Sequence, residues 1–343
     1  MSTTIDCAAN PRDVERLDDI LAPVRQELES VTDCLLSQLT DPVARTVVYL
    51  ITAGGKRLRP AMVLLSGAAG SSPNRPALID TAAAVELIHT ATLIHDDIID
   101  QSPLRRSQPT FHHRWGTERA VLMGDYLYAT AFTMLSRLDQ PAVMQIMADV
   151  CRQLCRGELR EVEARFRLDL TEPEYFAIIE DKTGSLIAGC CRCGAVLGGC
   201  DAETSERLGR FGAIFGLAFQ IIDDCLDLAG DQAEVGKTLL ADADKGVLSL
   251  PLIYLTQAVS ARERATLFAP LARARKAPGL RTMDPASLRR VAKAARESGA
   301  IARATDRARA LMDEAKELLA HVPMNGLAEA YQQLADYALT RRS

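Results

Sequence analysis

Residues 85–100 read VELIHTATLIHDDIID, an apolar stretch that ends in three aspartates. Its apolar residues recur every three or four positions, which is the spacing of one face of an α-helix. Residues 216–227, GLAFQIIDDCLD, repeat this arrangement. Pro103 follows the first stretch and Gly230 follows the second, and both residue types commonly end helices. The sequence therefore predicts two long helices, each with a DDxxD cluster near its carboxyl end.

The rest of the chain has the same helical character. Good helix formers such as Ala, Leu, Arg and Glu are abundant, while β-branched and aromatic runs are scarce. No low-complexity linker and no internal repeat divides the sequence. We therefore expect an all-α protein with a single domain over residues 1–343. The predicted helices cover about residues 13–37, 41–52, 60–70, 76–100, 117–137, 141–163, 173–198, 203–228, 249–258, 285–297, 300–320 and 325–340.

Composition argues against several classes of protein. Of the 343 residues, 48% are hydrophobic, which is enough for a large core, and the net charge of −5 gives no reason to expect a nucleic-acid partner. The basic region at about 262–309 lacks interleaved aromatic residues, so we interpret it as a solvated helical face. Residues 1–19 contain no apolar core of a signal peptide. Apolar stretches such as 211–222 fall short of the roughly 18 residues that suggest a membrane span.

The cysteines are spread along the chain, a usage consistent with a reducing cytoplasm. We therefore expect a cytoplasmic protein. Cys190, Cys191, Cys193 and Cys200 fall in one predicted helical segment. A zinc site is one interpretation of this group, and buried small apolar side chains are the other, which we favour.

The position of the aspartates is unfavourable for a helix. The carboxyl end of a helix carries partial negative charge, which disfavours carboxylates. Within each cluster the third aspartate lies four residues after the first, so like charges share one face at about 0.2–0.5 kcal/mol per pair. A bound cation would remove this repulsion. An Asp-rich helix end without function is a reasonable alternative for one cluster, but a weak one for two in matched contexts.

Oxygen ligands with no nearby Cys or His pair favour a hard metal ion. Mg²⁺ is the best candidate, because it combines one or two carboxylates with substrate phosphates and water. Candidate phosphate-binding cations lie near both clusters. A glycine turn with Lys56 and Arg59 opens a predicted helix, and such a helix start can bind an anion. The others are Arg105, Arg106, Lys182 and Lys237, each of which alone would be interpreted as a solvated cation.

Histidines are interpreted by their helical phase. His89 lies seven residues before Asp96, so it shares that face of the helix, and we expect it to contact substrate. His95, His112 and His113 are interpreted as ordinary structural residues.

Together these residues resemble the trans-type polyprenyl diphosphate synthases of the longer-chain kind. The similarity is carried by GGKRLRP (54–60), VELIHTATLIHDDIID (85–100), the arginine pair 105–106, GDYLYATAF (124–132), GELREVE (157–163), KTGSLIAGC (182–190), FQIIDD (219–224), GKTLLAD (236–242) and SLPLIYL (249–255). These motifs cover about residues 40–260, and the C-terminal helices at 285–340 are compatible with the family. The resemblance implies an orthogonal helical bundle of the isoprenoid synthase type, usually a homodimer.

The resemblance also implies roles for individual residues. Mg²⁺, about three ions with the diphosphate, would be held by Asp96, Asp100, Asp223, Asp224 and Asp227, with Asp97 supporting them. The allylic diphosphate would be bound by Arg105, Lys182, Thr183, Gln220 and Lys237. Isopentenyl diphosphate would be bound by Lys56, Arg59, His89 and Arg106. The implied reaction adds isopentenyl diphosphate head-to-tail to farnesyl or geranylgeranyl diphosphate.

Product length is predicted from residues below the first cluster. Ala91 and Thr92 lie five and four residues before Asp96, about one helical turn deeper. Both are small, whereas short-chain relatives have a bulky aromatic residue there. Phe132 could form the floor of the product channel at a deeper level. An ordinary core position is an equally good interpretation of this residue. We expect an all-trans hexaprenyl to decaprenyl product of the kind used for quinone side chains, released with loose membrane association.

The sequence departs from the family pattern at two places. Ser107 stands where the family usually has glycine after the arginine pair, and Val247 stands where it usually has lysine. The second departure puts one diphosphate contact in doubt, although Lys245 is close in sequence.

Three other functions are alternatives. A class I terpene cyclase would share the metal site but would not need the isopentenyl diphosphate site at Lys56, Arg59 and His89. A non-catalytic subunit of a heteromeric synthase should have lost metal ligands, and both clusters are intact. A shorter-chain farnesyl or geranylgeranyl diphosphate synthase stays an alternative within the same family.

Overall fold

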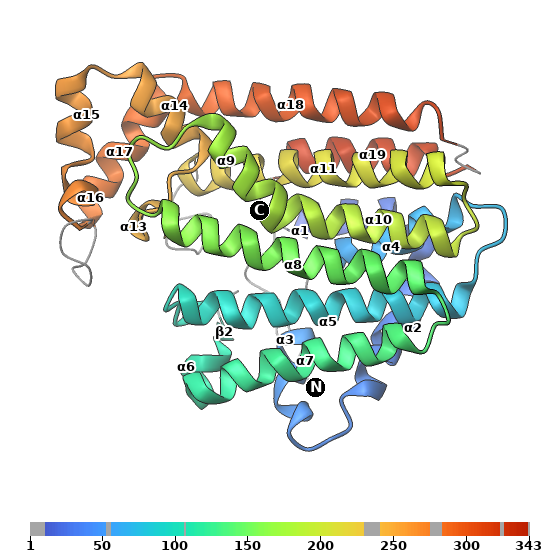
Figure 1. Ribbon diagram of the computed structural model, residues 1–343. Coiled ribbons are helices and arrows are strands. Elements are labelled where there is room, and N and C mark those ends of the chain that lie inside the picture. The colour runs from blue at the N-terminus through green and yellow to red at the C-terminus, as the bar shows by residue number, and fades with distance from the viewer. Residues whose placement is uncertain are drawn as a thin grey trace. The chain divides into compact units, whose positions relative to one another are not determined.

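The computed structural model describes residues 11–52, 56–105, 108–229, 241–274, 283–322 and 326–341. These residues are helical almost throughout, which confirms the predicted all-α class (Figure 1). Within these ranges the strands are β1 (Leu104–Arg105) and β2 (Gln108–Pro109), which pair antiparallel directly after the first aspartate cluster.

The helices of the N-terminal half are α1 (Pro11–Ile20), α2 (Arg25–Gln38), α3 (Val48–Thr52), α4 (Leu58–Ala68), α5 (Arg75–Ile99), α6 (Phe111–Trp115), α7 (Thr117–Ser136) and α8 (Pro141–Ala164). They are followed by α9 (Glu172–Ile179), a π-helical turn (Glu180–Gly184), α10 (Ser185–Leu197) and α11 (Ala202–Ala229). The remaining helices are α13 (Ala241–Asp244), α14 (Leu250–Ala258), α15 (Ala261–Leu267), α16 (Ala269–Ala274), α17 (Pro285–Glu297), α18 (Ala300–Leu319) and α19 (Ala328–Thr340).

The chain forms two compact units, each assembled from segments far apart in sequence. The first comprises Met1–Cys151, Leu186–Gly212 and Lys316–Tyr337, and the second comprises Arg152–Ser185, Ala213–Ala315 and Ala338–Ser343. Each unit contains one aspartate cluster. The single domain expected over residues 1–343 stays a prediction.

Helix α5 is the centre of the first unit. It packs against α2, α4 and α7, and Figure 1 shows α5 and α7 running side by side. Its amino end is capped by Asn74, whose side chain accepts a hydrogen bond from the Ala77 amide. By length and composition α5 could span a membrane, but 67% of its apolar window is buried inside the protein. That burial is what we expect of a core helix.

Small residues bring α4 and α10 into close contact in the first unit. A Cβ at Gly194 would clash with the Val63 carbonyl oxygen, and one at Gly198, directly after α10, would clash with that of Gly67. The buried Ser66 hydroxyl pairs with the Tyr331 hydroxyl at 2.9 Å. Cys190, Cys191 and Cys193 are fully buried and Cys200 is partly buried, as the apolar interpretation predicts for the first three.

In the second unit, α9 begins with a complete capping box. Thr171 and Glu174 each satisfy a backbone amide of the other, so the start of α9 is well defined. Helix α14 packs against both α9 and α17. The packing of α14 therefore supports α9 and the π turn that follows it.

Several predicted helix boundaries were wrong. The helix predicted over 13–37 is two helices, because Pro23 lacks an amide hydrogen and interrupts it with a short 3₁₀ turn. The helix predicted over 173–198 contains the π turn at Glu180–Gly184. Helices α15 and α16 were missed, although the capping box of Ser260 and Glu263 before α15 is visible in the sequence.

Candidate active site

The first aspartate cluster lies at the carboxyl end of α5, as predicted. Asp96 and Asp97 occupy its last turn, and Asp100 is the C-cap residue. Asp97 is only 2% exposed, whereas Asp96 and Asp100 are half-buried. The middle aspartate therefore points into the first unit while its neighbours stay accessible.

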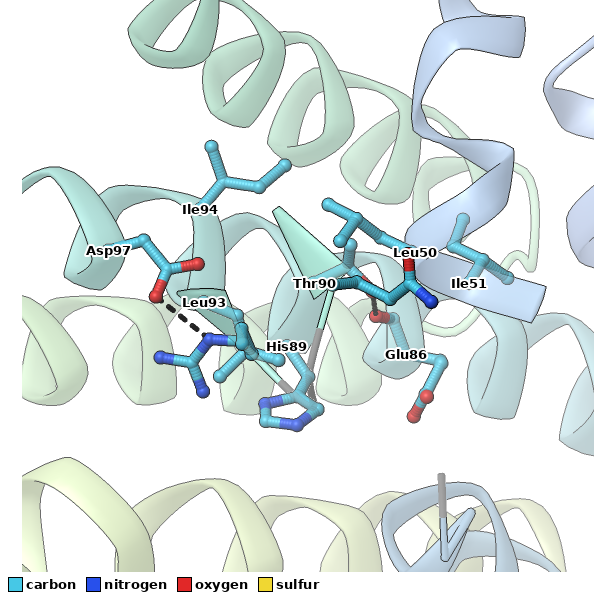
Figure 2. A pocket seen from close by; sticks show the side chains of 10 residues that line it. Leu50, Ile51, Glu86, His89, Thr90, Leu93, Ile94 and Asp97 are labelled. Carbon is cyan, nitrogen blue, oxygen red and sulfur yellow. Dashed lines mark hydrogen bonds and ion pairs between the residues drawn. The ribbon is translucent and has the colours of Figure 1, made fainter. Parts of the chain in front are cut away.

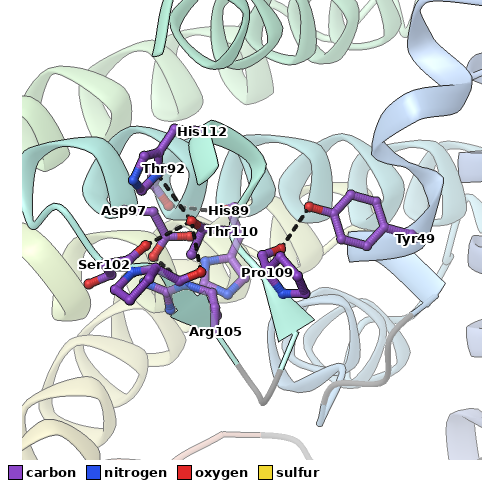
Figure 3. A network of polar contacts seen from close by, with 10 residues as sticks. Tyr49, His89, Thr92, Asp97, Ser102, Arg105, Pro109, Thr110 and His112 are labelled. Carbon is purple, nitrogen blue, oxygen red and sulfur yellow. Dashed lines mark hydrogen bonds and ion pairs between the residues drawn. The ribbon is translucent and has the colours of Figure 1, made fainter. Parts of the chain in front are cut away.

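Asp97 is bound by the hairpin that follows it. The Arg105 Nε donates a hydrogen bond to Asp97 Oδ1 at 2.9 Å (Figure 3). Burial raises the pKa of the Asp97 carboxyl, and the Arg105 charge partly counteracts this effect. A guanidinium has five N–H donors, so four remain on the terminal nitrogens of Arg105.

Neighbouring residues hold the hairpin in place. The Thr110 hydroxyl donates to the Ser102 carbonyl at 2.7 Å, and the Tyr49 hydroxyl donates to the Pro109 carbonyl at 3.1 Å. Figure 3 shows these contacts on both sides of Arg105. Thr110 also pairs with His112 Nδ1 at 3.2 Å, which agrees with the structural interpretation of that histidine.

A pocket opens beside α5 in the first unit. Figure 2 shows its lining, which comprises Leu50, Ile51, Glu86, His89, Thr90, Leu93, Ile94, Asp97, Arg105 and Gln108. His89 Nε2 lies 3.1 Å from Arg59 Nη1, and a guanidinium can only donate, so Nε2 is the acceptor. Lys56 lies over the Tyr337 ring, 5.8 Å from its centre. The first unit thus brings His89, Arg59 and Arg105 to one region of α5.

The sequence did not single out Arg57 and Glu86. Arg57 precedes α4 in the left-handed conformation, with φ of 44°. Its Nη1 contacts Glu86 Oε1 at 3.2 Å, and its Nη2 donates to the Ile51 carbonyl at 2.7 Å. These contacts hold the backbone between Lys56 and Arg59. No residue-type pattern in the sequence links positions 57 and 86.

The second aspartate cluster repeats the burial pattern of the first. Asp224 is 4% exposed, and Asp223 and Asp227 are half-buried near the end of α11. Asp224 Oδ2 accepts a hydrogen bond from the Tyr175 hydroxyl at 2.5 Å, and Oδ1 accepts one from Gln220 Nε2 at 2.9 Å. Burial raises the pKa of Asp224 well above its ordinary value, and the charge of Asp242 adds to the effect.

Asp242 and Arg341 are further residues that the sequence did not assign. Asp242 influences Asp224 electrostatically, and it belongs to the GKTLLAD motif. Arg341 is buried, and its Nη1 contacts Asp223 Oδ1 at 2.6 Å. Its guanidinium stacks on the Phe219 ring at 3.7 Å. Arg341 therefore supplies a positive charge to the first aspartate of this cluster.

Lys182 and Thr183 lie in the π turn between α9 and α10. Lys182 Nζ contacts Glu161 at 2.6 Å and Glu158 at 2.8 Å, both on α8. The Thr183 hydroxyl donates to Gln220 Oε1 at 3.0 Å. π turns of this kind are rare and often occur at functional sites.

Helix α8 fixes the π turn through the GELREVE motif. Asp181, buried in the turn, accepts hydrogen bonds from Arg156 Nε and Arg160 Nη1, each at 2.7 Å. A Cβ at Gly157 would lie 2.7 Å from the backbone nitrogen of Lys182, so only glycine fits at this contact. The motif quoted for the resemblance therefore has a physical role in the second unit.

The residues predicted to set product length differ in burial. Ala91 is fully buried, and the Thr92 hydroxyl donates to the His89 carbonyl at 2.7 Å. Phe132 is half-buried on α7, which packs against α5. Their effect on product length stays a prediction.

Some predicted residues lie outside the described ranges. These are Arg106, Ser107 and Lys237. Val247 is described, and its amide donates to the Asp242 carbonyl at 2.9 Å.

The carboxylates fit the chemistry of Mg²⁺. Among the described residues, no three His, Cys, Asp or Glu side chains form a ready-made metal site. Mg²⁺ commonly uses one or two carboxylates and takes its other ligands from substrate phosphates and water. Asp96 and Asp100, half-buried one helical turn apart at the end of α5, fit this role.

Comparison with known proteins agrees with this geometry. Residues 40–279 match the polyprenyl synthetase family. Nonaprenyl diphosphate synthase of Mycobacterium tuberculosis is 35% identical over 317 residues, covering 92% of this chain and 91% of the relative. Geranylgeranyl diphosphate synthase of Methanosarcina mazei is 39% identical over 210 residues, covering 60% of this chain and 64% of the relative.

A solved structure extends the similarity over nearly the whole chain. The crystal structure of a polyprenyl synthase from Caulobacter crescentus CB15, complexed with calcium and isoprenyl diphosphate, has a TM-score of 0.88 and 34% identity. The match covers 98% of this chain and 99% of that one.

The all-helical fold, the two aspartate clusters and these matches define a class of prenyl-transferring enzymes. The chain belongs to the polyprenyl synthetase family. The protein is accordingly a prenyltransferase of the prenyl diphosphate synthase type, and the predicted family and enzyme class are confirmed.

Gly157→Ala tests whether α8 supports the π turn. The added methyl would meet the Lys182 backbone, so the turn must shift, and we expect activity to fall at least tenfold, about 1.4 kcal/mol. The free energy of unfolding should fall by about 1–3 kcal/mol. Cys155→Ala, at an exposed position of the same helix, is the control and should change neither quantity. Wild-type activity in Gly157→Ala would refute the role of this contact.

Proposed function

We propose that the protein adds isopentenyl diphosphate units to an allylic prenyl diphosphate and makes a long all-trans polyprenyl diphosphate. The observation that carries this proposal is the repeated cluster in which one buried aspartate holds a predicted diphosphate-binding side chain, Arg105 in one unit and Gln220 in the other. The name of the M. tuberculosis relative supports a long product. A quinone side chain is the proposed destination of the product.

Each group of residues has a proposed task. Arg105, Lys182, Thr183, Gln220 and Lys237 bind the allylic diphosphate, and Lys56, Arg59, His89 and Arg106 bind isopentenyl diphosphate. Asp96, Asp100, Asp223 and Asp227 bind Mg²⁺, which neutralises the diphosphate leaving group. The Caulobacter polyprenyl synthase is complexed with both calcium and isoprenyl diphosphate, which supports a divalent ion acting with this class of substrate.

The proposed reaction balances without a further reactant. The allylic C–O bond breaks, and its electron pair leaves with the diphosphate. The double bond of isopentenyl diphosphate attacks the resulting allylic cation and forms the new C–C bond. The adduct then loses a proton, for which the released pyrophosphate is the proposed acceptor. Substrate positioning by the basic residues supplies much of the rate, and apolar walls exclude water from the cation.

Assembly and location are also proposals. Helix α7 exposes Val121, Leu122 and Tyr126, an apolar face that a second copy would cover in a homodimer. We further propose a cytoplasmic enzyme that contacts the membrane loosely during product release. Recovery of all the protein in the membrane pellet without detergent would contradict that location.

The activity is tested by incubating the protein with Mg²⁺, radiolabelled isopentenyl diphosphate and farnesyl or geranylgeranyl diphosphate. We expect a ladder of linear prenols after dephosphorylation, ending at a long chain, and no products when EDTA removes the metal. Pyrophosphate release from the allylic substrate alone, without incorporation of label, would instead support a terpene cyclase.

Ala91→Phe tests where the product grows. A ring at this buried position would fill space about one turn below Asp96, so the longest product should become shorter. Product chromatography measures the change, and the rate of the first condensation should stay within a factor of about three. Phe132→Ala provides the opposite test and should lengthen the product if Phe132 is the floor. An unchanged ladder in Ala91→Phe would place the channel elsewhere.

Leu122→Asp tests the homodimer. Leu122 is 66% exposed, and a charge there should yield a monomer by light scattering if a second copy covers it. Val43→Asp, at a position 63% exposed on another segment of the first unit, is the matched control and should leave the dimer intact. A wild-type protein that is monomeric at all concentrations tested would overturn the proposal.

A further inference from the structure

The two aspartate clusters share a pattern of burial that the DDxxD spacing alone does not predict. In each cluster the first and third aspartates are half-buried and the middle one is buried. We propose that the middle aspartates, Asp97 and Asp224, are positioning residues that orient diphosphate-binding side chains, and that Tyr175 fixes Asp224 for this task. This inference rests on the proposed function, and it assigns Asp224 differently from the metal-binding role that the sequence suggested.

In the first unit the oriented side chain is Arg105. Its Nε is bound to Asp97, so the guanidinium cannot rotate freely, and this contact does not use the edge formed by its two terminal nitrogens (Figure 3). That edge is the part of arginine that binds phosphate oxygens bidentately. Asp97 thus presents the phosphate-binding edge of Arg105 without needing to touch the substrate.

In the second unit the oriented side chain is Gln220. The Gln220 NH₂ group donates a hydrogen bond to Asp224 Oδ1 at 2.9 Å. The Gln220 oxygen therefore faces Thr183, whose hydroxyl donates to it. One carboxylate thus sets the amide orientation of Gln220 and the hydroxyl direction of Thr183.

Tyr175 completes this chain of hydrogen bonds. Its hydroxyl binds the Asp224 oxygen that Gln220 does not use. Both carboxylate oxygens of Asp224 thus have partners within the protein, which suits an orienting role better than metal coordination. Tyr175 is fully buried at the start of α9, where the Thr171–Glu174 capping box fixes the helix.

The test is a pair of double-mutant cycles, measured by the KM of each substrate and by calorimetric binding of inorganic pyrophosphate with Mg²⁺. In the first cycle, Tyr175→Phe should raise the allylic KM about tenfold, as expected for loss of one hydrogen bond to a charged group. The isopentenyl diphosphate KM should change less than twofold. In a Gln220→Leu background, which lacks the side chain that Asp224 orients, Tyr175→Phe should add no further effect.

The matched control is Tyr254→Phe. It also removes a phenol–carboxylate hydrogen bond in the second unit, the 3.0 Å contact with Glu172, and should leave both KM values and pyrophosphate binding unchanged. Thermal unfolding of both variants distinguishes a folding defect from a positioning defect. Equal losses for both substrates in Tyr175→Phe, or effects that add in the Gln220→Leu background, would overturn the role of Tyr175.

The second cycle combines Asp97→Asn with Arg105→Gln. If Asp97 acts through Arg105, its substitution should have no effect on pyrophosphate binding once Arg105 is replaced. Asp96→Asn, at a predicted metal ligand next to it, should still weaken binding in that background. Additive losses for Asp97→Asn would assign it to the metal instead. Pyrophosphate binding tests the inference even if the wild type forms no polyprenol, an outcome that would refute only the proposed function.

Discussion

A carboxylate buried at the carboxyl end of an apolar helix is the constraint on which the rest of this site depends. The charge loses solvation, and it meets the negative end of the helix dipole. The protein stabilises such a buried carboxyl group at two places with different donors. Arg105 donates to Asp97, and the neutral donors Tyr175 and Gln220 bind Asp224. In both cases a compensating group is a residue for which we propose diphosphate binding, Arg105 in the first unit and Gln220 in the second.

The fold class was predictable because helical periodicity depends on local spacing, which the sequence displays directly. The two clusters, and their place at helix ends, followed from the same pattern together with Pro103 and Gly230. The contacts of Arg57 with Glu86 and of Arg341 with Asp223 were not predictable, because the paired residues are far apart in the sequence. The first pair is separated by 29 residues and the second by 118. A single sequence contains no signal for such pairs.

Local conformation was predictable only where the chemistry is local. The capping box before α15 and the proline after α1 carry visible signals that could have corrected the helix boundaries. The π turn carries none, because it depends on Arg156, Arg160 and Gly157 of another helix. The sequence therefore assigned no role to GELREVE, although this motif is part of the family resemblance.

The π turn also constrains how this chain can change over time. A π turn holds one residue more than the α-helical turn it replaces. Deleting one residue from Glu180–Gly184 would restore a regular α-helical turn, so Lys182 and Thr183 could no longer both keep the positions that they have in the π turn. The segment therefore tolerates substitutions that preserve its length far better than insertions or deletions. Its five residues are expected to be kept in number even where their identities change.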